Sequence, residues 1–357
     1  MWIKDIELIN FRNYEKEKFE FVEGINVIHG YNGQGKSNLV EAISYISTLS
    51  SFRNSKNDDV INVDNDVGLI RCNTSKNQNI KISILKTKKN IIVDNQEVKR
   101  LRDYIGTVNV ICFSSDDIVN FKDSPHDRRR FFDVELSKID SEYAVNLIKF
   151  KKMLKQRNDV LKSKTIHLEK YLEVLDKQIV DISMSIYKKR KEFVDIINNI
   201  VENEFYLLTG EKKCLKIKLV SDFEGKDIHS IVESFKSTLI KDQEKGSTSF
   251  GVHKDDYECL LDGLDICSKC SSGQQRISLL SVKMSILRLV EEKSGEIPIL
   301  ILDDVFSELD EKKKECIVQR IKDVNQIFIT TTSVIEMNGV GYKYFKIENG
   351  KKIEERM

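Results

Sequence analysis

A glycine-rich segment near the N-terminus has the residue types and the spacing of a phosphate-binding loop. Residues 30–37 match G-x-x-x-x-G-K-[ST], between an apolar run (25–29) that predicts a strand and a pattern (36–49) that predicts a helix. Lys36 can reach the β- and γ-phosphates, and Ser37 can ligate Mg²⁺. A glycine-rich turn that happens to precede Lys-Ser would not explain the flanking strand and helix. We predict ATP binding by Gly30, Tyr31, Asn32, Gly33, Gln34, Gly35, Lys36 and Ser37.

An acidic pair near the C-terminus supplies the second part of a phosphoryl-transfer site. The apolar run 299–302 predicts a buried strand, and Asp303 and Asp304 follow it directly. Ligands bind at the carboxyl ends of strands in α/β sheets. Asp303 suits the Mg²⁺ shell, and Asp304 can orient or polarise the attacking water as the catalytic residue. Strands that end in acids are common, so this prediction depends on the phosphate loop.

A third segment, 271–275 (SSGQQ), opens a predicted helix and resembles the signature motif of ABC-type ATPases. The resemblance implies that Ser271 and Gly273 close over the γ-phosphate held by a second copy of the chain. The alternative is an ordinary serine helix cap. Asp310, in the segment 307–310 (SELD), resembles the D-loop of the dimer interface. No switch histidine stands at Thr330-Thr331-Thr332, so the γ-phosphate sensor would have to be a Thr hydroxyl or another group. No Q-loop glutamine is evident, and 113–117 (FSSDD) is taken as the equivalent stretch.

Buried strands that alternate with helices must position these residues, which predicts an α/β sheet. Between 126 and 209 the chain has neither Gly nor Pro, and Leu and Ile recur at heptad-like spacing from 168 to 186. We expect this stripe to be intramolecular core. The predicted fold is a P-loop ABC-type ATPase head with an inserted helical arm. Its parts are an N-terminal lobe (1–124), the arm (125–209) and a C-terminal lobe (210–357).

Composition limits the class of protein. The chain has 58 Lys and Arg against 57 Asp and Glu, so attraction to nucleic acid requires a local basic face. No apolar run reaches ~18 residues, which predicts no membrane span. Seven cysteines and an N-terminus without an apolar signal core predict a cytoplasmic protein in a reducing compartment. Cys267-x-x-Cys270 lacks a second pair for zinc, so incidental cysteines are the better interpretation.

Taken together, these residues resemble the RecF family, which is related to the heads of structural-maintenance-of-chromosomes proteins. The similarity runs from residue 3 to about 332, and its further segments are 8–14 (LINFRNY), 51–53 (SFR), 124–133 (SPHDRRRFFD), 251–256 (GVHKDD) and 303–310 (DDVFSELD). Val252, Lys254 and Ser272 depart from the family pattern. The change at Ser272 puts one contact across the dimer in doubt. His253 has either a structural role or one near the nucleotide.

The resemblance implies a nucleoid-associated protein of recombinational DNA repair and replication restart. It implies a homodimer in ATP that clamps duplex, single-stranded or gapped DNA, and slow, DNA-dependent ATP hydrolysis that releases it. It also implies RecR- and RecO-like partners that help to load a recombinase. The alternatives are a transporter-type subunit, a nuclease-coupled ATPase and a version that binds ATP without hydrolysis. An arm of about 85 residues argues against the first, and no spare acidic cluster supports the second.

Candidate phosphate contacts for DNA are Arg128, Arg129 and Arg130, together with arm residues that include Lys188, Lys189, Arg190 and Lys191. For each of them, a solvated helix face with acidic neighbours is the competing interpretation. We expect contacts to the DNA backbone rather than to bases, because a repair protein cannot depend on sequence.

Overall fold

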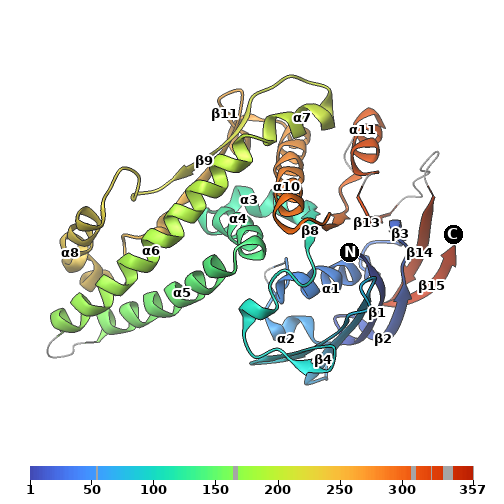
Figure 1. Ribbon diagram of the computed structural model, residues 1–357, viewed down its shortest axis with the longest axis horizontal. Helices are drawn as coiled ribbons and strands as arrows, with labels where there is room; N and C mark the ends of the chain where they lie inside the picture. The colour runs from blue at the N-terminus through green and yellow to red at the C-terminus, as the bar shows by residue number, and fades with distance from the viewer. Residues whose placement is uncertain (54, 164–167, 307–310, 323, 333–340, 357) are drawn as a thin grey trace. The chain divides into compact units, whose positions relative to one another are not determined.

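The computed structural model describes residues 1–53, 55–163, 168–306, 311–322, 324–332 and 341–356 (Figure 1). The chain forms two compact units. Unit 1 comprises Met1–Val119, Val201–Lys213 and Ser271–Met357, and unit 2 comprises Asn120–Ile200 and Cys214–Cys270.

The two compact units do not coincide with the predicted arm of 125–209. Helix α7 (Val201–Thr209) belongs to unit 1, where Arg320 of α11 (Glu311–Ile321) makes a bidentate ion pair with the buried Glu204. Conversely, residues 214–270 belong to unit 2. There the Asn198 side chain exchanges two hydrogen bonds with the backbone of Ile217. Such long-range contacts leave no trace in the local sequence pattern.

The central sheet of unit 1 carries the strands that end at the predicted site. Its order is β15-β14-β3-β13-β12-β8, with all pairs parallel except β14 and β15. The strands are β3 (Gly24–His29), β8 (Val110–Ser114), β12 (Ile299–Asp303), β13 (Gln326–Thr331), β14 (Tyr342–Glu348) and β15 (Lys351–Arg356). Strands β8, β12 and β13 are buried along their whole length, which explains their continuous apolar sequences.

A second sheet of unit 1 is antiparallel, with the order β2-β1-β4-β5-β6-β7. Its strands are β1 (Ile3–Phe11), β2 (Tyr14–Glu20), β4 (Val67–Thr74), β5 (Asn79–Leu85), β6 (Lys89–Val93) and β7 (Gln96–Glu97). The alternating Ile80, Ile82 and Ile84 of β5 are fully buried, as period-two patterning predicts. They share one core with helix α1 (Lys36–Thr48) and with Phe345 of the central sheet.

Helices complete unit 1. They are α1, α2 (Asn57–Val60), α7, α10 (Ser272–Ser294) and α11, with the short 3₁₀ turn η1 (Leu101–Asp103). Helix α10 is buried along most of its length and packs against α7 and β8. Helix α3 (Ser115–Asp123) carries the chain from unit 1 into unit 2.

Unit 2 combines long helices with a small sheet. Its helices are α4 (Pro125–Ile139), α5 (Ser141–Lys162), α6 (Leu168–Asn198), α8 (Ile228–Lys245) and α9 (Ile266–Lys269), with the 3₁₀ turn η2 (Val252–Lys254). The sheet order is β11-β10-β9, formed by β9 (Leu215–Val220), β10 (Asp256–Leu261) and β11 (Leu264–Asp265). Helices α5 and α6 run side by side (Figure 1). The stripe residues Leu172, Leu175, Ile179 and Ile186 are buried, so the prediction of intramolecular core is confirmed for them.

Within the described part of the chain, no helix has both the length and the apolar character that a membrane span requires.

Candidate nucleotide-binding site

The glycine-rich loop joins β3 to α1 in unit 1, as the sequence predicts. Two glycines are required by close contacts. A Cβ at Gly30 would lie 2.4 Å from the Ile347 carbonyl oxygen, and one at Gly35 would lie 2.8 Å from the Asn13 side chain. Gly35 also has a left-handed φ of 114° at the N-cap of α1. The loop can keep its backbone against β14 and the β1–β2 turn only because both positions lack a side chain.

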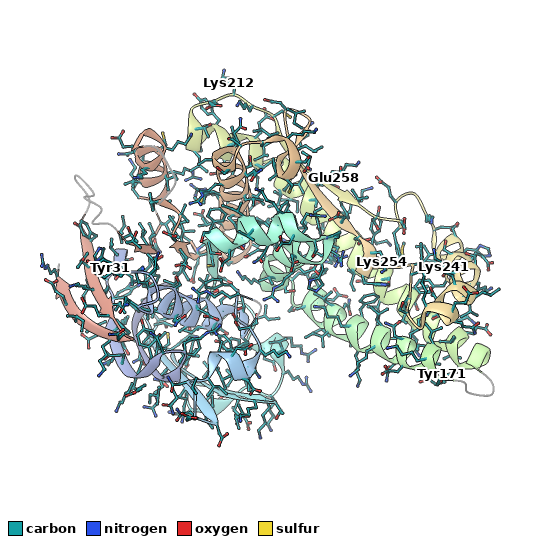
Figure 2. The ribbon with its side chains drawn as sticks, turned by 180° about the vertical axis from the view of Figure 1, so that it is seen from behind. Tyr31, Tyr171, Lys212, Lys241, Lys254 and Glu258 are labelled. Atoms are coloured by element: carbon teal, nitrogen blue, oxygen red, sulfur yellow. The ribbon has the colours of Figure 1, made fainter. Side chains whose placement is uncertain are left out.

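Lys36 lies at the mouth of this loop. Its ammonium group donates hydrogen bonds to the carbonyl oxygens of Gly30 (2.8 Å) and Tyr31 (2.9 Å), and the residue is 7% exposed. Burial lowers the pKa of Lys36, while the carboxylates of Asp304 and Asp303 oppose this shift. By contrast, the Tyr31 side chain is 76% exposed on the surface of unit 1 (Figure 2). The loop therefore presents a held cation to an incoming phosphate.

Asp303 joins the loop to the end of β12. The Ser37 hydroxyl donates to Asp303 Oδ1 at 2.8 Å, and the Thr330 hydroxyl of β13 donates to the same oxygen at 2.6 Å. Burial raises the pKa of Asp303, and these two hydrogen bonds act against that rise. Hydroxyl and carboxylate oxygens are the ligands that Mg²⁺ prefers, and it usually takes only one or two from protein alongside phosphates and water. The pair Ser37 and Asp303 therefore fits Mg²⁺ with a bound nucleotide.

Asp304 has a backbone conformation that is uncommon for a residue other than glycine. Its φ is 55°, in the left-handed region that Asn and Asp adopt more readily than most residues. Its N–H donates to Thr330 Oγ1 at 2.9 Å, and Arg276 of α10 donates to its carbonyl oxygen at 3.3 Å and to that of Val305 at 3.0 Å. Such strained conformations cluster at functional sites, where neighbours hold them. The support of Asp304 by Thr330 and Arg276 was not predicted from the sequence pattern.

Two turns of unit 1 hold Gln34 of the loop. The Gln34 carbonyl oxygen accepts from the Asn13 side chain (3.2 Å) and from the Gly350 N–H (2.9 Å). Its side-chain oxygen accepts from the Asn349 N–H at 2.7 Å. The β14–β15 turn thus fixes the loop from the C-terminal part of the chain. Sequence reasoning assigned no element to 342–356, although its alternating apolar residues are a strand signal.

A charged network lies behind the site. Glu41 of α1 is fully buried, accepts two hydrogen bonds from Arg12 (2.6 and 3.0 Å), and lies 3.7 Å from Arg53. The Arg53 guanidinium also lies 4.0 Å from Asp303 and 3.9 Å from Asp116. Arg53 belongs to the segment 51–53, which was named above as part of the family resemblance, with no chemical role assigned to it. Arg53 therefore places a positive charge near Asp303, the carboxylate that is predicted to bind Mg²⁺.

Ser271 is the N-cap of α10. Its hydroxyl accepts from the Gln274 N–H at 3.3 Å, and Gln274 Oε1 accepts from the Ser271 N–H at 3.0 Å, which completes a capping box. Ser271 is exposed, and a Cβ at Gly273 would meet no atom within 4 Å. The cap interpretation is therefore correct, and it leaves the helix N-terminus open to a ligand. The same helix supplies Arg276, which supports Asp304.

Three further predictions have different outcomes. Asp310 and the segment 307–310 lie outside the described residues. In 330–332, the Thr330 hydroxyl is buried, donates to the Asp303 carboxylate and accepts from the Asp304 backbone N–H. In 113–117, Ser114 lies beside Asp303 in the β8–β12 register, and its N–H donates to Asp117 at 2.8 Å.

The arginines proposed for DNA contact have internal partners. Arg128 makes a bidentate ion pair with Asp256 (2.7 and 2.8 Å), and Arg129 donates to the Asp255 carbonyl oxygen at 2.5 Å. Arg130 also has an interaction partner. The prediction for Arg190 is wrong, since it is 2% exposed and pairs with Asp133 and Asp255. These residues hold unit 2 together, and the structure gives no support for DNA contact by them.

The segment 251–256 is part of the same internal network. Its acids Asp255 and Asp256 bind Arg190 and Arg128, as described above. His253 Nε2 lies 3.0 Å from the Thr248 carbonyl oxygen, and burial lowers the pKa of His253 to about 4. Of the two roles considered for His253, the structural one has these contacts in its favour.

The two cysteines considered for metal binding lie in or next to α9. The Cys267 thiol lies 3.8 Å from the Phe121 carbonyl oxygen, and burial raises the pKa of Cys267 to about 11. Among the side chains that the structure describes, no group of three or more potential ligands could hold a metal ion. Cys267 is therefore a protonated thiol at neutral pH.

Comparisons with known proteins agree with this geometry. The sequence model of the family described as RecF/RecN/SMC N terminal domain matches residues 2–353. The DNA replication and repair protein RecF of Clostridium beijerinckii is 36% identical, with 99% of both chains covered. That of Clostridium botulinum is also 36% identical, with 98% of this chain and 99% of the relative covered.

Solved structures extend the comparison. The recombination mediator protein RecF with ATP superposes with a TM-score of 0.89 at 31% identity, covering 100% of this chain and 98% of that one. The Smc head domain of Pyrococcus furiosus superposes with a TM-score of 0.54 at 17% identity, covering 98% and 95% of the two chains, and shares the fold alone.

Proposed function

The chain belongs to the RecF family of ABC-type ATPase heads, and from this premise we propose that it is an ATP-controlled, DNA-binding protein of recombinational repair and replication restart. Its relatives are named DNA replication and repair proteins. In this proposal, ATP makes two copies of the chain close on DNA, and slow hydrolysis releases them.

The observation that carries the proposal is the convergence of Lys36, Ser37 and Asp303 on one point of unit 1. Ser37 and Asp303 are in contact at 2.8 Å, and Lys36 is held at the loop mouth. This is the arrangement that binds a nucleoside triphosphate with its metal ion in P-loop ATPases. We assign the triphosphate to residues 30–37 and the Mg²⁺ to Ser37 and Asp303, where the ion would neutralise phosphate charge.

Ser271 and Gly273 have the complementary role in a second copy. An exposed helix N-terminus offers N–H groups and a positive dipole end to an anion. Because Ser271 is exposed and Gly273 is unobstructed, the start of α10 can approach a γ-phosphate bound by a partner. The dimer would then have two equivalent sites related by a two-fold axis, each built from both subunits. Asp310 is assigned to the same interface by family resemblance.

Hydrolysis is assigned to Asp304. The residue next to the metal-binding carboxylate can orient the attacking water and accept its proton, and the left-handed backbone aims its side chain differently from that of Asp303. Turnover is slow and depends on DNA, so that ATP acts as a timer. Dissociation of the two copies after hydrolysis opens the clamp.

The partners in this proposal follow from the family. A solved relative is described as a recombination mediator in the RecFOR pathway, and we propose RecR- and RecO-like partners for this chain. Together with them, the protein would help to load a recombinase onto single-stranded DNA at gaps. Duplex DNA and single-strand–duplex junctions are the proposed nucleic-acid ligands.

Sedimentation velocity tests the proposal. Wild type and Lys36→Arg are compared in ATP and in ADP, with and without duplex DNA. We expect wild type to form a dimer that co-sediments with DNA in ATP only, and Lys36→Arg to stay monomeric in both nucleotides. Wild type that remains monomeric and DNA-free in ATP contradicts the mechanism. Single-turnover assays with and without DNA then separate hydrolysis from binding alone.

A further inference from the structure

One outer face of unit 2 carries lysines with no internal partner. Helix α5 has four exposed lysines within seven residues, at Lys149, Lys151, Lys152 and Lys155. No acidic residue occurs between Glu142 and Asp159. Among the described residues, none of the four lysines has a hydrogen bond or an ion pair. We call these four residues the α5 lysine stripe.

Some other exposed lysines of unit 2 have acidic partners. Lys177 pairs with Glu173 at 3.2 Å, Lys218 with Glu258 at 3.4 Å, and Lys236 with Glu233 at 2.8 Å. The remaining basic residue of the acid-free segment, Arg157, is buried and bound to Asp176 and Asp242. Since the whole chain has a net charge of only +1, the stripe is a local excess of positive charge.

The stripe faces away from the core of unit 2. The buried residues of α5 include Phe150 and Leu161, and Lys149, Lys152 and Lys155 lie across the helix from them, whereas Lys151 lies at the border of the buried face. Figure 1 shows α5 along one edge of unit 2, and contacts with other elements of that unit come from α4, α6 and α8. The lysine side chains are therefore accessible to a ligand.

The geometry points to the phosphate backbone of duplex DNA as that ligand, and we propose that the α5 lysine stripe binds it. Lys149 to Lys155 spans about 9 Å at ~1.5 Å per residue. Duplex DNA carries one charge per ~1.7 Å of axis, so about five phosphates lie along the same length. The inference rests on the proposed function, which supplies DNA as a partner, and it assigns this contact to α5 instead of to Arg128–Arg130.

The composition of the face favours duplex DNA over two other ligands, a protein and single-stranded DNA. Protein interfaces are rich in Trp, Tyr and Arg and poor in Lys, whereas the stripe is lysine alone with one exposed aliphatic neighbour, Ile148. Sites for single-stranded DNA usually combine positive charge with aromatic rings on which the bases stack. The aromatic residues of α5, Tyr143 and Phe150, are both buried. The stripe has neither arginine nor aromatic side chains, and its lysine ammonium groups suit contacts to phosphates that do not depend on base sequence.

The test compares two triple variants of the full-length chain. The first is Lys149→Gln, Lys152→Gln and Lys155→Gln. The second, as control, is Lys177→Gln, Lys218→Gln and Lys236→Gln, which removes three exposed charges from the same unit. Affinity for duplex DNA in ATP is measured by fluorescence anisotropy over a range of salt concentrations. Binding of a fluorescent ATP analogue and thermal unfolding report nucleotide binding and folding.

The stripe variant is expected to bind duplex DNA at least tenfold more weakly than wild type at low salt. Each lost phosphate contact lowers the slope of log affinity against log salt by about 0.9, so the slope should fall by about 2 to 3. The control should keep the wild-type slope, and all three proteins should bind the ATP analogue equally. A stripe variant with wild-type affinity and slope overturns the inference and leaves the proposed function intact.

Two other outcomes also overturn it. Equal losses in both triple variants would mean that only net charge matters. Loss of binding to polyglutamate with unchanged binding to DNA would assign the stripe to an acidic protein. If wild type itself binds no duplex DNA in ATP, the proposed function fails together with the inference.

Discussion

At the scale of single residues, two adjacent carboxylates have different surroundings. Asp303 is 4% exposed and accepts hydrogen bonds from Ser37 and Thr330 on one oxygen. Asp304 is less buried, and Thr330 and Arg276 hold its backbone N–H and carbonyl oxygen. The first is suited to binding a cation, and the second has its backbone fixed next to that site. Thr330 connects the two, because its hydroxyl donates to one residue and accepts from the other.

Asp304→Asn tests the division of roles. Asparagine tolerates the left-handed conformation, so the backbone of this residue should be preserved. We expect ATP binding within a few-fold of wild type and hydrolysis slowed about 10²- to 10⁴-fold, since a general base is lost. Single-turnover hydrolysis and sedimentation in ATP measure both effects, and the dimer should persist. Asp303→Asn serves as comparison and should weaken Mg²⁺-dependent ATP binding. Wild-type turnover in Asp304→Asn would remove Asp304 from the mechanism.

His253 should make unit 2 sensitive to acid. Its pKa is lowered to about 4 by burial, against an ordinary value of about 6.5. Between these values the unfolded chain binds the proton and the folded chain does not, so the free energy of unfolding falls as pH is lowered from about 6.5 to about 4. Urea unfolding at several pH values measures this effect. Between about pH 6.5 and 4, the free energy of unfolding should fall less for His253→Gln than for wild type. His229→Gln, at an exposed position of α8, should retain the wild-type loss. Identical pH profiles for wild type and His253→Gln would contradict this account.

At the scale of elements, the strands and helices of the nucleotide site follow from local pattern. The apolar runs 25–29, 299–302 and 327–330 are buried strands, and the Lys36 and Ser271 helices begin where their glycines and caps predict. Asp94 and Asn95, residue types that favour turns, lie between β6 and β7 with positive φ values of 49° and 65°. Each of these signals acts over a few residues, which is why sequence alone reveals them.

Longer-range features could not be found in the same way. Residues 201–209 continue the Gly- and Pro-free segment, yet they pack in unit 1 because Glu204 pairs with Arg320. The arginines at 128, 129 and 190 look like surface charges in sequence, and only tertiary structure brings acids to them. The support of Gln34 by Asn13 and Asn349 joins segments that are far apart in the chain. Predicting it requires the strand order of the sheet.

The β14–β15 turn should control nucleotide affinity. In Gly350→Ala the new Cβ would lie 2.3 Å from the Asn13 carbonyl oxygen, at a φ of 70°, so the turn must move away from Gln34. We expect at least tenfold weaker binding of a fluorescent ATP analogue. Gly295→Ala is the matched control, with a φ of 71° and open space around its Cβ. Gly295→Ala should lose about 1 kcal/mol of stability through backbone strain, and Gly350→Ala should lose more because of its steric clash. Equal ATP affinity in the two variants would show that the turn does not position the loop.

At the scale of the whole molecule, the proposed active form requires two chains. Within one chain, the phosphate loop and the start of α10 both belong to unit 1. The proposal places Lys36 of one copy and Ser271 of the other on the same triphosphate. If each site is built from two chains, two inactive variants can complement each other, which a mechanism within one chain does not allow.

Mixing two inactive variants should restore activity. Lys36→Ala lacks the phosphate contact, and Ser271→Asp keeps a helix cap as good as serine while placing a negative charge at the γ-phosphate. Mixed dimers contain one intact site, formed by Lys36 of one variant and Ser271 of the other. Random pairing should return up to about a quarter of wild-type ATP hydrolysis.

The control for this mixing experiment is Lys36→Ala combined with the double variant Lys36→Ala, Ser271→Asp. No dimer in that mixture has an intact site, so the mixture should stay inactive. Thermal unfolding of Ser271→Asp should match wild type. Absence of recovery in the first mixture would mean that the two residues do not share a ligand.

The strand order of the central sheet also has a consequence for biosynthesis. Strand β3, which leads into the phosphate loop, pairs only with β13 and β14, whose residues are 326–331 and 342–348. At roughly 5–20 residues per second, a ribosome needs about 15–60 s to make the chain between them. During that interval the apolar β3 segment has no sheet to join, and both of its edges can pair with other chains. The nascent protein therefore depends on a chaperone or on rapid local collapse around β1 and β2, and it cannot grip a nucleotide until its late strands have been translated.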